Sequence, residues 1–107
     1  MAEIVVFVTA GTNEEAETIA RHLVEEKLAA CVNIIPAVLS VFRWQGKISQ
    51  EKETLLIIKS VSARLEAITE KVKLLHSYEV PEVIAVPVVG GSKDYLDWLK
   101  GETAAAS

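Results

Sequence analysis

The segment from His76 to Glu82 holds the densest group of side chains that could do chemistry. It runs His-Ser-Tyr-Glu-Val-Pro-Glu, so an imidazole, a phenol and the carboxylates of Glu79 and Glu82 follow closely on one another. Imidazole and carboxylate groups bind divalent metals and also supply hydrogen-bond donors and acceptors. Alternatively, His76 ends the preceding helix, where its ring interacts favourably with the helix dipole, and its neighbours are solvated. Spacing alone leaves both interpretations open.

Two charged residues share one face of an expected strand. Lys59 follows the apolar run Leu55–Ile58, and Glu53 lies six residues before it. Alternate residues of a strand point to the same side, so both side chains face one way. A lysine at this place either meets an anion in a cleft or extends its long stem to solvent. The pair could bracket a polar ligand, although ordinary surface charges explain it more simply.

The chain has a single cysteine, Cys31, which excludes an internal disulfide and any metal motif built on a cysteine pair. Cys31 could be a nucleophile or a metal ligand, but a lone cysteine is more often a small packed side chain. Trp44, at the tip of an expected hairpin, and Trp98, in the last expected helix, are most simply explained as packing residues.

Composition and missing motifs exclude several classes of protein. Half of the 107 residues are apolar, and the net charge of −4 works against non-specific nucleic-acid binding. No apolar run approaches the roughly 18 residues of a membrane span, and the first residues lack the basic region of a signal peptide. No phosphate-binding glycine loop or nucleophile motif is present. We therefore expect a cytoplasmic, non-enzymatic protein that contacts neither nucleic acid nor membrane, with residues 1–107 forming a single domain.

The hydrophobic pattern predicts four strands and three helices. Strands are expected at 3–10, 31–44, 47–60 and 83–89, and helices at 12–28, 62–75 and 92–99, before a frayed tail at 103–107. This β-α-β-β-α-β order with a terminal helix predicts an α+β, ferredoxin-like sandwich, in which two helices cover one face of a four-stranded antiparallel sheet. Gln45-Gly46 is expected to form the turn of the long hairpin, and Pro36 and Pro87 each indicate a bulge or an edge strand.

The expected hairpin is too long for one small domain. Each arm has about 14 residues, or roughly 45 Å of extended chain. A compact domain of this length is only about 35 Å across. The arms should therefore project, carrying side chains such as Val41, Phe42 and Ile48 into water. Because an isolated hairpin with such side chains is an association site, the sequence predicts an obligate homo-oligomer.

Several segments together resemble the CutA family of divalent-cation tolerance proteins. They are Ala29–Asn33, Trp44–Lys47, Glu53, Ile58–Lys59, His76–Glu82 and Tyr95–Trp98, and the resemblance extends from Glu3 to about Leu99. It implies a ferredoxin-like subunit in a homotrimer whose hairpins extend one subunit's sheet onto the next, similar to the PII signalling proteins. It also implies a link to tolerance of copper and other divalent metals, with metal binding by some members.

The resemblance also implies site residues. We expect a ligand cleft between subunits lined by Cys31, Trp44, Glu53, Lys59, Tyr78 and Trp98, and a divalent metal such as Cu²⁺ bound by His76, Glu79 and Glu82. Lys59 would contact a small anionic ligand. Copper-binding bacterial members place a cysteine at the position of Val8 and a second histidine at that of Leu75, so a copper site here would be weaker and less selective. The alternatives are a PII-like effector-binding trimer and a structural scaffold, both without a metal role.

Overall fold

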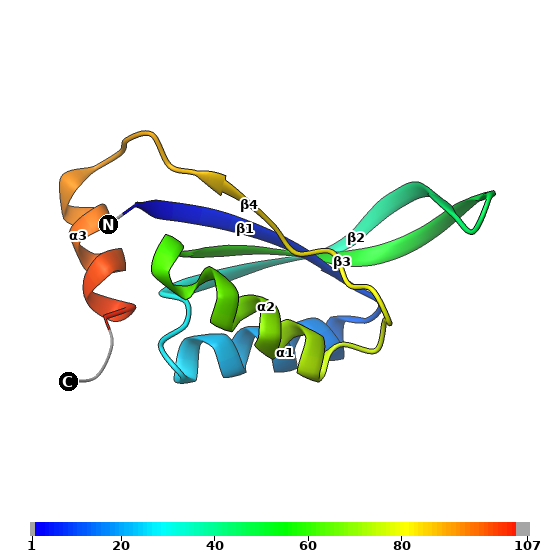
Figure 1. Cartoon of the computed structure of the whole chain (residues 1–107), viewed down its shortest axis with the longest axis horizontal. Coiled ribbons are helices and arrows are strands. Elements are labelled where there is room, and N and C mark those ends of the chain that lie inside the picture. The colour runs from blue at the N-terminus through cyan, green and yellow to red at the C-terminus, as the bar shows by residue number, and fades with distance from the viewer. Residues whose placement is uncertain (1, 105–107) are drawn as a thin grey trace.

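The computed structural model describes residues 2–104, which form a four-stranded antiparallel sheet with three α-helices (Figure 1). The strand order is β2-β3-β1-β4, which confirms the predicted ferredoxin-like arrangement. The strands are β1 at Glu3–Ala10, β2 at Cys31–Trp44, β3 at Lys47–Val61 and β4 at Ile84–Pro87. The helices are α1 at Asn13–Glu25, α2 at Leu65–Leu75, which follows a 3₁₀ turn at Ser62–Arg64, and α3 at Lys93–Glu102.

The core lies between the sheet and the helices α1 and α2, which cover the same face (Figure 1). Along β1 the residues alternate: Val6 and Val8 are fully buried toward the helices, whereas Val5 and Phe7 face the other side and are only half-buried. Both helices turn an apolar stripe toward the sheet, formed by Ala16, Ile19, Ala20 and Leu23 of α1 and by Ile68 and Val72 of α2. Helices α1 and α2 leave the second face of the sheet uncovered (Figure 1).

Helix α1 begins as the sequence predicts and ends earlier. The hydroxyl of Thr12 accepts a 3.1 Å hydrogen bond from the backbone N–H of Glu15, which caps the first turn. The helix ends before Leu28 because Lys27 adopts a left-handed conformation, with φ of 60°. The N–H of Leu28 then donates to the carbonyl of Leu23 at 2.9 Å, which closes the helix as a Schellman motif.

The β2–β3 hairpin projects beyond the rest of the sheet, as predicted (Figure 1). The eight residues of β1 pair only with the 54–61 half of β3, so residues 38–53 have no third strand beside them. The longest dimension of the protein is accordingly 45 Å. Gln45 and Gly46 have φ of 51° and 79°, as the predicted two-residue turn requires.

A bulge interrupts β2 at the predicted place. The register shifts by one residue between Ile35, which faces Leu55, and Val38, which faces Glu53. Ala37 takes up the extra residue with φ of 68°. Pro36, which cannot donate to a strand neighbour, lies on an edge strand, as does Pro87 of β4.

Two further predictions, for the last strand and the C-terminal tail, are wrong. The last strand ends at Pro87 rather than at residue 89, and Val89 is fully exposed. The frayed tail does not begin at Thr103, which is 2% exposed: its hydroxyl donates to the carbonyl of Leu99, and its own carbonyl accepts from the Arg64 guanidinium. Residues 105–107 of the predicted tail lie outside the described range.

Candidate functional site

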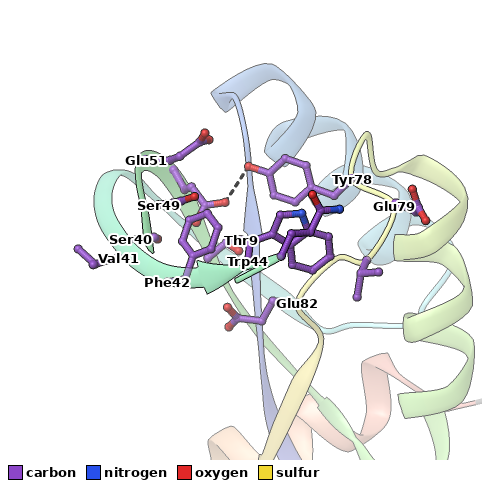
Figure 2. A pocket seen from close by; sticks show the side chains of 13 residues that line it. Thr9, Ser40, Val41, Phe42, Trp44, Ser49, Glu51, Tyr78, Glu79 and Glu82 are labelled. Atoms are coloured by element: carbon purple, nitrogen blue, oxygen red, sulfur yellow. Dashed lines mark hydrogen bonds between the residues drawn. The ribbon is translucent and has the colours of Figure 1, made fainter. Parts of the chain in front are cut away.

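A groove of about 730 Å³ lies between the projecting half of the hairpin and the segment 78–82 (Figure 2). Alternate residues of both hairpin strands face it, because one side of each strand is turned toward this segment. From the hairpin these include Ser40, Phe42, Trp44, Ser49, Glu51 and Glu53, and the segment contributes Tyr78, Glu79, Val80 and Glu82. Thr9, one residue before the end of β1, also lines the groove.

The carboxylate of Glu53 is buried in the wall of this groove. The residue is 7% exposed, and its Oε2 accepts a 2.7 Å hydrogen bond from the Tyr78 hydroxyl (dashed in Figure 2). Tyr78 can lie here because residue 11 is glycine: a Cβ on Gly11 would be 3.3 Å from the hydroxyl oxygen. Within residues 2–104, no group donates a hydrogen bond to the other Glu53 oxygen, and no ion pair includes this residue.

The ring of His76 connects the segment 78–82 to the end of β1. Its side chain is fully buried, and Nε2 lies 2.7 Å from the carbonyl oxygen of Thr9. A carbonyl only accepts, so Nε2 carries the hydrogen. Nδ1 in turn accepts a 3.0 Å hydrogen bond from the backbone N–H of Tyr78. Both ring nitrogens are therefore used in fixing Tyr78 beside the end of β1.

Glu15 of α1 supports the same segment from the helix side. Its Oε2 accepts a 3.0 Å hydrogen bond from the backbone N–H of Ser77. Its Oε1 lies 3.6 Å from Nδ1 of His76 and is buried with no hydrogen-bond partner among the residues of the described range. Glu15, whose backbone N–H is capped by Thr12, thus also anchors through its side chain the segment that carries Tyr78.

The groove is acidic. Glu51, Glu53, Glu79 and Glu82 line it, and no lysine, arginine or histidine of residues 2–104 does. The pKa of Glu82 is raised, first because desolvation disfavours its charged form and second because Glu53 carries the same charge. The pKa of Tyr78 is also raised, by burial and by its hydrogen bond to the Glu53 carboxylate, so its hydroxyl stays a donor. A positive charge in the groove would relieve the repulsion between these carboxylates.

The predicted metal set of His76, Glu79 and Glu82 is not assembled within one chain. The ring nitrogens of His76 are both hydrogen-bonded, and Figure 2 shows the side chains of Glu79 and Glu82 directed away from each other. Across residues 2–104, no group of three or more His, Cys, Asp or Glu side chains could hold a metal ion. Val8 is fully buried in the core and Leu75 packs against it, so neither position opens to the groove.

Only part of the predicted cleft is brought together. Trp44, Glu53 and Tyr78 line one groove of the single chain. Lys59 shares a face of β3 with Glu53, but six residues of extended strand separate them by roughly 20 Å.

The other predicted cleft residues, Cys31 and Trp98, do not line this groove. Cys31 faces Lys59 across the β2–β3 pair. The Lys59 ammonium donates a hydrogen bond to Oδ1 of Asn33, and the Cys31 sulfur lies 4.0 Å from the same oxygen. Trp98 is on α3, with its ring centre 5.4 Å from that of Tyr95, at the opposite end of the sheet from the hairpin tip (Figure 1).

Phe42 and Glu51 are among the groove residues that the sequence analysis missed. Phe42 was expected only as an apolar side chain of the projecting hairpin, and Glu51 was not considered. The hairpin pattern could have indicated them, because alternate residues of paired strands share a face: 40, 42 and 44 of β2 lie on the same face as 49, 51 and 53 of β3. The bulge at Ala37 was needed to know which alternation faces the segment.

Comparison with known proteins identifies the family. Residues 4–102 match the model of the CutA1 divalent ion tolerance protein family. The chain belongs to this family. It is 48% identical over 101 residues to the divalent-cation tolerance protein CutA of Thermus thermophilus, and this match covers 94% of the chain and 98% of that protein. It is 52% identical over 100 residues to the chloroplastic protein CutA of Arabidopsis thaliana, covering 94% of the chain but only 55% of that protein's length.

Solved CutA structures have the same fold. A divalent cation tolerance protein from Thermus thermophilus superposes with a TM-score of 0.93 at 47% identity, over 95% of this chain and 99% of the other. CutA1 from Oryza sativa superposes with a TM-score of 0.95 at 48% identity, over 99% and 97% of the two chains. The resemblance proposed from short segments of the sequence is thereby confirmed.

We predict that Tyr78→Phe lowers the free energy of unfolding by about 1–3 kcal/mol, because it leaves the buried Glu53 carboxylate without its donor. Urea unfolding of the two proteins measures the difference. Tyr95→Phe is the control: Tyr95 is 44% exposed, and its hydroxyl makes no hydrogen bond to any residue of the described range, so it should change stability by no more than about 0.5 kcal/mol. Equal effects of the two variants would contradict the role given to the Tyr78 hydroxyl.

We predict that Glu82→Gln raises the thermal midpoint at neutral pH. The folded protein raises the pKa of Glu82 above 4.5, so the stability gained from its neutral form is lost as pH rises through the raised value. Glutamine stays neutral and keeps that stability, whereas below about pH 4 both side chains are neutral and the difference should disappear. Thermal unfolding at several pH values measures this. A difference that persists or grows in acid would refute the assignment, and Glu70→Gln, on the exposed face of α2, controls for net charge.

Proposed function

We propose that this CutA family member is a homotrimer that takes part in the response to divalent cations by binding a positively charged ligand in the groove. The observation that supports this most strongly is the Glu53 carboxylate, which is buried, lacks a positive partner among residues 2–104 and lies beside other carboxylates. An uncompensated buried charge is unfavourable unless something of opposite charge approaches it. A ligand cation would supply that charge.

The ligand is bound rather than transformed. The groove contains the hydroxyls of Ser40 and Ser49 but no lysine, arginine or histidine of the described residues to activate them. His76, the nearest imidazole, is fully buried with both nitrogens occupied. These features support a binding or signalling protein, in keeping with the names of the relatives.

The divalent metal is the ligand that those names suggest, and Cu²⁺ is the metal expected from the resemblance. Carboxylates of Glu79 and Glu82 would supply oxygen ligands. The donors within one chain do not converge, so a bound metal would need further ligands from a neighbouring subunit or a rearrangement that frees His76.

The trimer is supported by the uncovered face of the sheet. Its centre is apolar and half-buried, and its margins carry exposed apolar residues: Ile35 of β2 is 42% exposed, Ile84 of β4 56% and Val86 43%. The strands β2 and β4 are also free edges. Association with further copies of the chain would bury the apolar face and pair the edge strands. An exposed apolar face and an unpaired edge both favour association.

We also propose that the protein acts in the cytoplasm. None of the helices formed by residues 2–104 is long and apolar enough to cross a membrane. Among the relatives, the Arabidopsis thaliana protein is named as chloroplastic and a solved structure from Archaeoglobus fulgidus as periplasmic. Fractionation of the source cells would decide the location.

Sedimentation and metal titration test the proposal together. At micromolar concentration the protein should sediment at three times the 11.7-kDa mass of the chain. Titration with Cu²⁺, Zn²⁺ and Ni²⁺ should show binding that Glu53→Gln weakens by about tenfold or more, since it removes one charged contact. Glu70→Gln should leave the affinity unchanged. A monomer would refute the assembly, and equal affinities in wild type and Glu53→Gln would refute the groove as the cation site.

A small anionic ligand at Lys59 is a second candidate. Its ammonium lies on the uncovered face, hydrogen-bonded to Asn33, and no ion pair within residues 2–104 includes it. Lys59→Ala should then weaken binding of inorganic phosphate about tenfold without changing the oligomer, whereas Lys73→Ala on α2 should have no effect. Unchanged phosphate affinity in Lys59→Ala would eliminate this site.

A further inference from the structure

We propose that the groove takes an elongated organic polycation, of the class of linear aliphatic polyamines, in preference to a single metal ion. This inference rests on the cation-binding function proposed above and specifies its ligand. It is carried by three features of the groove: its size and spread of charge, its aromatic walls, and the buried Glu53–Tyr78 pair.

The size of the groove and the spacing of its charges do not suit one ion. A space of about 730 Å³ accommodates an extended molecule. Four glutamates line it, yet within residues 2–104 no three acidic, histidine or cysteine side chains lie close enough to hold a metal ion. Separated carboxylates attract separated positive charges, as a chain carrying several ammonium groups provides.

The walls of the groove suit the methylene chain between such charges. Phe42 and Trp44 line it from the hairpin and are 38% and 48% exposed in the single chain, and Tyr78 faces them from the segment 78–82 (Figure 2). Aromatic faces pack against methylene groups and attract ammonium groups through cation–π contacts. A hydrated divalent metal ion would use neither property.

The Glu53–Tyr78 pair provides an anchor for one terminal ammonium. Oε2 of Glu53 is occupied by the Tyr78 hydroxyl, whereas Oε1 accepts no hydrogen bond from a described residue. The Tyr78 hydroxyl donates to Glu53, so its own oxygen is left as an acceptor. A primary ammonium carries three donors and can bond to both oxygens at once. Burial of this carboxylate strengthens its hydrogen bond to a charged donor.

Isothermal titration of the intact oligomer with spermidine, compared with uncharged 1,8-octanediol, tests the inference. Spermidine should bind and the diol should not, and binding should weaken as salt is added. Glu53→Gln should lower the affinity about tenfold or more, and Trp44→Ala about threefold or more. Glu70→Gln, which removes the same charge outside the groove, should leave the affinity unchanged. Trp44 is exposed at the hairpin, so its variant remains informative if Glu53→Gln fails to fold.

Competition with metal separates the possible failures. If Cu²⁺ binds and depends on Glu53 while spermidine neither binds nor competes, the polyamine assignment is overturned and the cation-binding function stands. If neither cation binds, both are overturned. If spermidine fails to bind and Glu53→Gln makes the oligomer dissociate at higher concentration, a neighbouring copy of the chain fills the groove, which also overturns the assignment. Equal losses in Glu53→Gln and Glu70→Gln would show attraction to net charge alone.

Discussion

The unequal lengths of two neighbouring strands determine the architecture. β3 has fifteen residues and β1 has eight, so β1 can pair with only one half of β3. The other half of β3 keeps β2 as its sole partner and extends past the core. Where β1 ends at Ala10, the sheet loses a strand and leaves a hollow beside the hairpin. The chain returning from α2 crosses this hollow and becomes the second wall of the groove.

The position of that second wall depends on contacts between distant parts of the chain. His76 links the carbonyl of Thr9 to the backbone of Tyr78, and Glu15 holds Ser77 from the start of α1. The role of His76 is therefore structural. Its buried ring fixes the position of the segment 78–82 relative to β1. Because Tyr78 belongs to this segment and donates to Glu53, that position also determines the surroundings of the Glu53 carboxylate.

Elements with strong periodicity or clear capping residues were predictable from the sequence, whereas several boundaries and contacts were not. The strand order and the hairpin turn follow from local patterns. The end of α1 does not, because the left-handed residue that ends the helix is Lys27. Glycine usually occupies such a position, so the sequence gives no indication of it. Thr103 was expected in a frayed tail, whereas its carbonyl accepts a hydrogen bond from Arg64, which is distant in sequence. These are tertiary effects that override local preference.

The candidate site was predictable in its residue types but less so in its geometry. The polar segment 76–82 and Trp44 were recognisable from their composition and place. The distance between Glu53 and Lys59 follows from counting strand residues, and it separates two groups that the family resemblance had joined. The roles of the ring nitrogens of His76 could not be known before the fold placed Thr9 beside them.

The bulge at Ala37 has a consequence for how the hairpin can change. Because β2 gains one residue there, its even-numbered positions beyond the bulge occupy the side that odd-numbered positions hold before it. If the same residues paired without a bulge, Ala37 instead of Val38 would face Glu53, and Val41 and Arg43 would stand where Phe42 and Trp44 now stand. A change of pairing register, without any substitution, would thus exchange an aromatic wall for an aliphatic one bearing a guanidinium. The one extra residue in β2 therefore decides which face of the outer hairpin, and with it which charge, is turned toward the groove.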